Sequence, residues 1–151
     1  MQDGNVHCHV ANLARRNGRG GERIAVATAA YNAGERLWSE REQRYVDFGN
    51  REDVVFSKII LPDGAPAWAA RRNELWNRVD LEAKRRDARL AKSIEVAITR
   101  DVPKDMRPAL VEAFAAPFVA RGCVADVAIH EDGTGHNPHA HILLTTRVLE
   151  P

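Results

Sequence analysis

Residues 123–146 read CVADVAIHEDGTGHNPHAHILLTT, and this stretch decides the fold. It holds two short runs, residues 123–130 and 139–146, separated by a segment of glycine, proline and polar residues. Side chains alternate in character along both runs, which is typical of β-strands, and the turn residues between them predict a hairpin. In this hairpin His130 lies opposite His139, and His141 shares their face. The opposite face is purely apolar and is expected to pack on helices: Val127, Ile129, Ala140, Ile142 and Leu144.

The remaining chain is interpreted outward from this hairpin. We expect strands at residues 7–13 and 88–99 and a second hairpin formed by residues 43–48 and 54–61. Helices are predicted at residues 22–33, 66–86 and 103–120, with Gly34 ending the first and Pro117 kinking or shortening the last turn of the third. This order of elements predicts an α+β fold with a central, mostly antiparallel, five-stranded sheet and helices packed on it.

Composition limits the class of protein. The chain has 151 residues, with 44% hydrophobic residues, 28% charged residues and a net charge of +1. These values are ordinary for one globular domain and exclude a disulfide scaffold or low-complexity disorder. Because there is no long apolar run and no secretory signal, we expect a cytoplasmic monomer that makes no membrane contact. The sequence is interpreted as a single domain over 1–151 and as a fragment of a longer protein.

Histidine is concentrated in one place, because four of the six histidines lie in residues 130–141. The shared face of His130, His139 and His141 brings three imidazoles together, and such a set can bind a divalent metal while leaving positions open for substrate. The alternative is a set of surface histidines in a histidine-rich hairpin. His136 lies in the turn, and we treat it as a non-ligand.

Two carboxylates are candidate partners for these imidazoles, since metal-ligating histidines donate their second N–H to an acceptor. Glu95 lies on the polar face of the strand expected at residues 88–99, where it is either such a partner or an exposed sheet glutamate. Asp126 is the weaker candidate for the same role.

A tyrosine and a basic loop complete the set of candidate residues. Tyr31 shares a helix face with small and apolar residues, so by itself it is expected to be a core aromatic; near a metal site it becomes a candidate nucleophile. A glycine-rich loop precedes this helix, and glycines let a phosphate backbone approach closely. The candidate DNA contacts flank or lie in this loop: Arg15, Arg16, Arg19 and Arg23.

Five ordered motifs resemble those of MobA/MobL-type mobilization relaxases, a family of the His–hydrophobic–His (HUH) endonuclease superfamily. The motifs are YNAGERL at residues 31–37, IILP at 59–62, IEVA at 94–97, VAIH at 127–130 and NPHAHILLTTR at 137–147. One departure is Asn32, which stands where family members often have arginine and is therefore expected to alter DNA contacts.

The resemblance implies a relaxase palm-like fold and a metal-dependent endonuclease and strand transferase. Such an enzyme nicks single-stranded DNA at a plasmid transfer origin through a covalent 5′-phosphotyrosyl intermediate and religates it during conjugative mobilization. By the same resemblance Tyr31 is the nucleophile, Glu95 is an acidic residue behind the histidines, and His130, His139 and His141 are the metal ligands.

The expected metal is Mg²⁺ or Mn²⁺, although three imidazoles also bind Zn²⁺. Accessory relaxosome and coupling proteins are the expected partners besides DNA. Two alternatives stay open at this point. One is a three-histidine metal hydrolase in which Tyr31 is structural, and the other is a DNA-binding module without cleavage activity.

Overall fold

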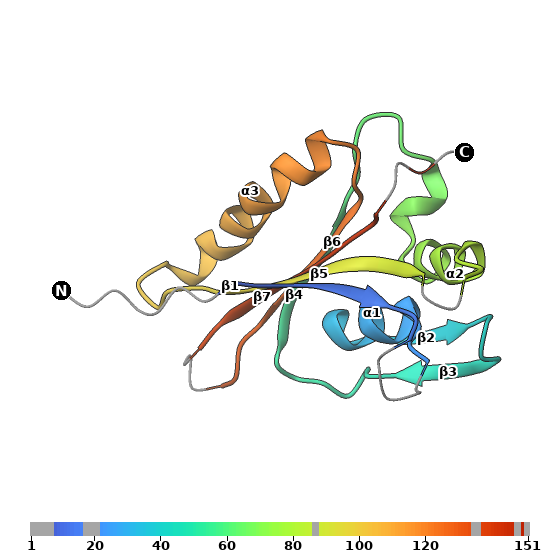
Figure 1. Cartoon of the computed structure of the whole chain (residues 1–151). Coiled ribbons are helices and arrows are strands. Elements are labelled where there is room, and N and C mark those ends of the chain that lie inside the picture. Colours follow the sequence, from blue (N-terminus) through green and yellow to red (C-terminus); the bar gives the residue numbers. More distant parts are fainter. Residues whose placement is uncertain (1–7, 17–21, 86–87, 134–136, 147–148, 150–151) are drawn as a thin grey trace.

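The protein is built around a five-stranded antiparallel sheet with the strand order β1-β5-β7-β6-β4. The computed structural model describes residues 8–16, 22–85, 88–133, 137–146 and 149. The sheet confirms the predicted fold class, and Figure 1 shows it as the central layer of the molecule. Within the described residues, no helix is both long enough and apolar enough to cross a membrane. The strands are β1 (Cys8–Ala14), β4 (Val54–Ile60), β5 (Arg89–Ala97), β6 (Ala125–His130) and β7 (His139–Leu144).

Helices cover both faces of this sheet (Figure 1). Helix α3 (Arg107–Ala120) lies on one face, while α1 (Ala25–Ala33) and α2 (Arg72–Glu82) pack on the other. The face under α3 is apolar as predicted, and it includes fully buried Val127 and Ile142. The face under α1 and α2 carries the polar residues of β6 and β7, so the sheet separates an apolar layer from the layer that holds the histidines.

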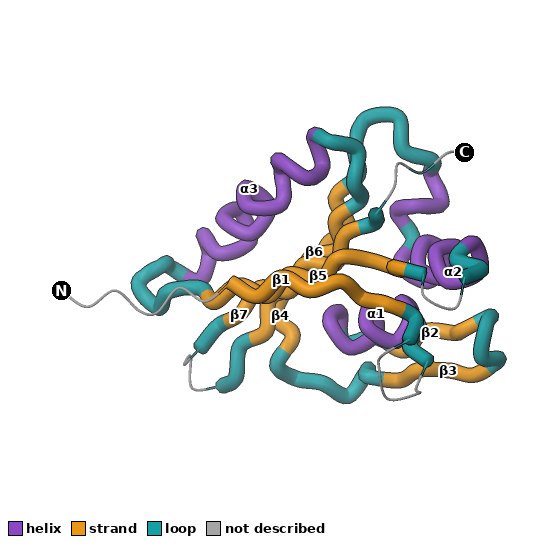
Figure 2. Tube along the Cα trace, in the orientation of Figure 1, coloured by secondary structure: helices purple, strands orange, loops and turns teal. Residues whose placement is uncertain are grey.

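The second predicted hairpin is wrong in its pairing. Strand β3 (Arg44–Asp47) pairs with β2 (Arg36–Ser39), which was not predicted, and the two form a separate two-stranded sheet beside α1 (Figure 2). Trp38 and Tyr45 face each other across this pair with ring centroids 4.9 Å apart. Strand β4 instead pairs with β6 in the central sheet. Strand β3 therefore pairs with β2, the strand directly before it in the sequence, and the aromatic cross-strand pair favours this register.

Helix boundaries also differ from the predictions. Helix α1 begins at Ala25 rather than at residue 22, because the carboxylate of Asp80 on α2 accepts hydrogen bonds from the Ala25 and Val26 N–H groups at 2.7 and 3.1 Å. The helix predicted over residues 66–86 is interrupted at Arg71, whose backbone is extended. It consists of a 3-10 turn, η1 (Ala67–Ala70), followed by α2.

The third predicted helix also begins later than expected. A second 3-10 turn, η2 (Lys104–Met106), leads into α3, which continues through Pro117 to Ala120. The structure therefore agrees with three predicted helical regions and corrects where each one starts or stops.

Candidate active site on the histidine face of the sheet

The β6–β7 hairpin places the three histidines as predicted. His130 pairs directly with His139, and His141 pairs with Ala128 two positions further along the hairpin. Registered partners in an antiparallel pair point to the same face, so all three imidazoles lie on the face that α1 and α2 cover. His130 is buried, whereas His139 and His141 are half-buried.

The imidazoles of His130 and His141 stack against each other, with ring centroids 4.1 Å apart and planes inclined by 33°. Burial lowers the pKa of His130. Burial, followed by the charges of His130 and His139, lowers the pKa of His141 to about 4. These two rings are therefore neutral at pH 7, which is the form of imidazole that binds metals.

Tyr31 lies near the C-terminal end of α1, beside His130. Its side chain is 44% exposed. Its ring meets His130 edge-on with centroids 6.0 Å apart, and Phe48 edge-on at 5.3 Å. Of the two interpretations of this tyrosine, the structure disagrees with a buried core aromatic, because nearly half of the residue is exposed.

Gly34 lets the end of α1 approach the sheet. It has a φ of 66° and ends the helix by donating its N–H to the Ala30 carbonyl, as the sequence predicts for a C-terminal glycine. A Cβ atom at this position would lie 3.0 Å from Cγ2 of Val54 on β4. A side chain here would push the Tyr31 turn away from β4 and from the neighbouring histidines.

Arg51 belongs to the site but was missed by sequence reasoning. Its guanidinium carbon lies 4.1 Å from the centroid of the Tyr31 ring, and its Nη1 donates to the Tyr31 carbonyl at 3.0 Å. Asp53 holds the guanidinium through Nε at 2.9 Å and through Nη2, and this contact lowers the pKa of Asp53. Arg51 follows a Gly-Asn turn, and it contacts His130 across 79 positions of sequence. No local pattern could reveal that contact.

Glu95 lies where the alternation of its strand predicts. It pairs with His141 in the β5–β7 register, and its Oε1 is 3.7 Å from His141 Nδ1. That separation exceeds a hydrogen bond, and the Glu95 side chain is half exposed. The carboxylate is therefore beside the histidines but does not orient one of them as placed.

Most of the chain matches a known protein family. Residues 23–151 match the family model described as the MobA/MobL family. The chain belongs to the MobA/MobL family. This confirms the resemblance expected from the five motifs.

The relatives of this MobA/MobL chain are transfer proteins. It is 39% identical over 146 residues to a "Probable mobilization protein MobA" from Bifidobacterium longum, covering 96% of this chain and 25% of the relative. It is 34% identical over 142 residues to a "Conjugal transfer protein TraA" from Agrobacterium fabrum, covering 87% of this chain and 13% of the relative. The chain thus spans a quarter or less of the length of these two curated relatives.

A solved structure has the same fold. It is described as "Molecular Basis of Vancomycin Resistance Transfer in Staphylococcus aureus" and matches with a TM-score of 0.87 at 28% identity. The match covers 96% of this chain and 72% of that chain. The sheet and the helices on both its faces are therefore an arrangement shared with a known protein.

Asp126 is a correction to the sequence interpretation. Its carboxylate is buried and accepts hydrogen bonds from Arg72 Nε at 2.8 Å and from Trp76 Nε1 at 2.9 Å. Arg72 also pairs with Glu35 at 3.0 Å. Asp126 therefore ties α2 to the sheet, and its oxygens are not available to an imidazole.

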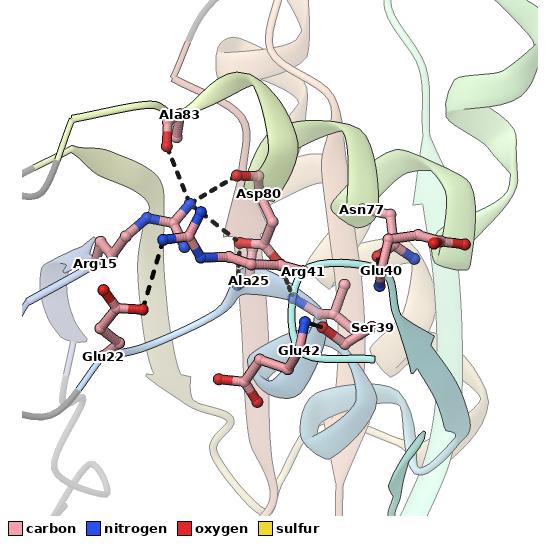
Figure 3. A network of polar contacts seen from close by, with 11 residues as sticks. Arg15, Glu22, Ala25, Ser39, Glu40, Arg41, Glu42, Asn77, Asp80 and Ala83 are labelled. Carbon is pink, nitrogen blue, oxygen red and sulfur yellow. Dashed lines mark hydrogen bonds and ion pairs between the residues drawn. The ribbon is translucent and has the colours of Figure 1, made fainter. Parts of the chain in front are cut away.

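The basic loop of this MobA/MobL domain is only partly as predicted, and Arg15 is a second correction. The Arg15 side chain is 1% exposed, and its Nη2 donates to the carbonyls of Asp80 at 2.7 Å and Ala83 at 3.3 Å (Figure 3). A buried guanidinium that holds α2 cannot contact a DNA phosphate. Arg16 and Arg23 are exposed, and their contact with DNA stays a prediction, whereas Arg19 and His136 lie outside the described residues.

Asn32 contributes to the site through its backbone. It is buried, so its side chain does not reach a surface where DNA would lie. Its main-chain carbonyl instead lies 2.7 Å from His130 Nε2. The contribution of this position to the site is therefore a backbone acceptor, which the residue type alone does not reveal.

The three imidazoles do not form a ready-made metal site. Within the described part of the chain, no three histidine, cysteine or carboxylate side chains form a ready-made metal site. Both ring nitrogens of His130 have neighbours, since Nε2 contacts the Asn32 carbonyl and Nδ1 faces Nη2 of Arg51 at 3.5 Å. The imidazoles as placed do not fit a metal unless one of these two contacts is given up.

Proposed function

We propose that this domain is a relaxase that nicks single-stranded DNA at a transfer origin and rejoins it, with Tyr31 as the nucleophile. The observation that carries the proposal is the exposed Tyr31 ring beside His130 in a chain of the MobA/MobL family. A nucleophile must reach a large polymeric substrate, and an exposed tyrosine ring beside the three histidines meets that requirement.

The proposed reaction is a transesterification at phosphorus. The Tyr31 oxygen forms a bond to the scissile phosphorus, and the bond from phosphorus to the 3′ oxygen breaks. The phenol loses its proton, and the released 3′ oxygen gains one. The product is a 5′-phosphotyrosyl DNA with a free 3′ hydroxyl. One phosphodiester has been exchanged for another, so the reverse step can religate the strand without an energy source.

The surrounding side chains support this role for Tyr31. The Arg51 guanidinium stacks over the Tyr31 ring, so it places a positive charge beside the residue that would meet a negatively charged phosphate. Phe48 and His130 flank the ring and restrict its rotation. These contacts hold the nucleophile in one orientation before DNA binds, and such positioning lowers the barrier to reaction.

We also propose a divalent cation, Mg²⁺ or Mn²⁺ with Zn²⁺ as an alternative, bound by His130, His139 and His141. Neutral imidazole is a suitable ligand for these ions. When bound, such a cation offsets negative charge on a scissile phosphate. The imidazoles as placed do not fit such a cation. The roles given above to Tyr31, Arg51 and Phe48 are therefore argued without it.

The proposed substrate and partners follow from the family. Exposed Arg16 and Arg23 are proposed to contact DNA phosphates beside the N-terminal end of α1. Relaxosome accessory proteins and a coupling protein are proposed as partners of the whole protein.

A covalent-adduct assay tests the proposal. The chain is incubated with a labelled single-stranded oligonucleotide of the origin and Mn²⁺, and the products are separated on a denaturing gel. We expect a protein–DNA adduct that disappears in Tyr31→Phe and persists in Tyr45→Phe. Tyr45 is the matched control because it is 50% exposed and also has an arginine, Arg36, stacked on its ring at 3.6 Å.

The other outcomes identify the alternatives. Cleavage that survives Tyr31→Phe would identify a hydrolase in which Tyr31 is structural. Binding without cleavage by the unaltered chain would identify a DNA-binding module. Either result would overturn the proposed function.

A further inference from the structure

Arg72 joins two parts of the chain that meet at the candidate active site. It is the first residue of α2, and its side chain is 10% exposed. Its Nε and Nη2 donate to the Asp126 carboxylate at 2.8 and 2.9 Å, and its Nη1 lies 3.0 Å from Oε1 of Glu35. One guanidinium therefore contacts both β6, the strand that ends at His130, and the turn that follows the Tyr31 helix.

The sheet end of this contact is held rigidly. Asp126 is buried, and besides the bidentate contact with Arg72 it accepts a hydrogen bond from Nε1 of Trp76, one turn further along α2. Trp76 is itself fully buried. The loss of either charge would leave the other one buried without its partner, which is strongly unfavourable. Because a guanidinium is planar, the bidentate contact also fixes the direction of its third nitrogen.

Glu35 connects this fixed guanidinium to the end of α1. Its N–H donates to the Ala30 carbonyl in the last turn of the helix at 3.1 Å. Its carbonyl accepts from the Phe48 N–H at 3.0 Å, and the Phe48 ring meets the Tyr31 ring edge-on. The Glu35 backbone thus contacts the two segments that hold Tyr31, while its side chain is bound to α2.

The ion pair of Glu35 with Arg72 is suited to restrain the turn rather than to stabilise the fold. The Glu35 side chain is 43% exposed, and solvent screens ion pairs of this kind, so they add little to stability. A charge-assisted contact to a guanidinium that is already fixed nevertheless has a defined direction and length. It therefore limits where the turn after Tyr31 can lie.

We propose that Arg72 is a positioning residue for nicking, which through Asp126 and Glu35 sets the place of the Tyr31 turn relative to the histidines of β6 and β7. This inference rests on the proposed function. A misplacement of the reacting group by about 1 Å can slow a reaction by about 100-fold, so a restraint on the turn next to the nucleophile affects the rate.

Glu35 is the residue to alter, because Arg72 and Asp126 are buried and their replacement endangers the fold. The rate of adduct formation is measured in single-turnover reactions at saturating origin oligonucleotide, and the affinity for that oligonucleotide is measured by fluorescence anisotropy. We expect Glu35→Ala to lower the rate about tenfold and to keep the affinity within about twofold, because DNA still binds while the nucleophile is misplaced. An unchanged rate, or a loss of affinity that accounts for the loss of rate, overturns the inference.

Two further variants distinguish positioning from other roles. Glu35→Gln keeps an oxygen acceptor for Nη1 of Arg72 at the same side-chain length, so we expect it to retain most of the rate. Glu74→Ala is the matched control and should react as the unaltered chain does, since Glu74 is 35% exposed and pairs with Arg71 and Arg78. A rate of Glu35→Gln as low as that of Glu35→Ala, or an equal loss in Glu74→Ala, overturns the positioning role.

A spectroscopic measurement tests the inference without DNA. The chain has two tyrosines, Tyr31 and Tyr45, so labelling with 3-fluorotyrosine gives two ¹⁹F signals, which the Tyr45→Phe variant assigns. We expect the Tyr31 signal to move in Glu35→Ala and to keep its position in Glu74→Ala. An unmoved Tyr31 signal in Glu35→Ala overturns the inference even where nicking is observed. Absence of an adduct with the unaltered chain overturns the proposed function instead, and the ¹⁹F signal still reports whether Glu35 positions Tyr31.

Discussion

The two ends of α1 are each held by an arginine and an aspartate from other parts of the chain, and the two pairs differ in burial. At the N-terminal end, Arg15 and Asp80 are 1% and 0% exposed. At the C-terminal end, Arg51 and Asp53 are 18% and 36% exposed. The first pair caps the helix and joins it to α2. In the second pair, Arg51 contacts Tyr31 and His130.

Residue type therefore does not decide which arginine belongs to the site. Arg15 is in a basic, glycine-rich segment that suggests DNA binding, yet it is buried and stabilises the fold. Arg51 is in an ordinary turn, yet partial exposure and its neighbours place it beside the candidate nucleophile. We therefore expect substitutions in the Arg15–Asp80 pair to lower the stability of the fold, and substitutions in the Arg51–Asp53 pair to affect the candidate site.

The largest effect is expected at the buried pair. Asp80→Ala removes the acceptor of two N-terminal N–H groups of α1 and leaves the Arg15 guanidinium without its carboxylate. We expect the free energy of unfolding to fall by about 3–5 kcal/mol in urea denaturation. Asp47→Ala is the control, because the Arg36–Asp47 pair is more than half exposed and should contribute little. An equal loss of unfolding free energy in Asp80→Ala and Asp47→Ala would contradict the expected difference between the buried and the exposed pair.

A smaller effect is expected at Gly34, next to the second pair. Alanine at a φ of 66° costs about 1–2 kcal/mol, and here its Cβ would also meet Val54 at 3.0 Å. Gly64→Ala separates the two causes, since Gly64 has a φ of 80° with nothing within 4 Å. We expect thermal unfolding to show a greater loss for Gly34→Ala. A loss no greater than that of Gly64→Ala would show that the close approach of α1 to β4 does not matter.

The half-buried Arg51–Asp53 pair itself should contribute little to stability. Arg51→Met is expected to lower the free energy of unfolding by less than about 1 kcal/mol, because solvent screens the partly exposed ion pair with Asp53. Urea denaturation of this variant beside Asp80→Ala measures the contrast directly. If Arg51→Met were as damaging as Asp80→Ala, Arg51 would be a structural residue and the distinction between the two ends of α1 would fail.

The smallest effect concerns the surface arginines near the N-terminal end. Replacing Arg16 or Arg23 by alanine should reduce the slope of log affinity against log salt by about 0.7 for each phosphate of single-stranded DNA that the arginine neutralises. Arg15→Met should leave this slope unchanged, provided that the variant is folded at the temperature of the measurement. Fluorescence anisotropy with a labelled oligonucleotide at several salt concentrations checks both. A changed slope in folded Arg15→Met would restore Arg15 as a DNA-binding residue.

Local pattern was sufficient where the decisive contacts lie between neighbours in sequence. Alternation along residues 123–146 predicted the β6–β7 hairpin, the pairing of His130 with His139 and the apolar opposite face. Glycine chemistry likewise predicted the end of α1 at Gly34.

Prediction failed where distant segments decide the outcome. The start of α1 depends on Asp80, 55 positions away, and the burial of Arg15 depends on the same residue. The β2–β3 pair replaced the expected hairpin because β4 found its partner in β6, a preference that only the assembled sheet provides. The contacts that Arg51 and the Asn32 carbonyl make with His130 also join distant segments, so the sequence did not predict them.

The long sequence separation within the site has a consequence for protein synthesis. His130 and Asn32 are 98 positions apart, and His130 and Arg51 are 79 positions apart. Contacts at such separations form late, because the chain between them must first be closed into a loop. A nascent chain on the ribosome therefore carries its tyrosine long before β6 and β7 emerge to meet it. Under the proposed function, the ability to cut DNA arises only when the domain is complete, so incomplete translation products lack it.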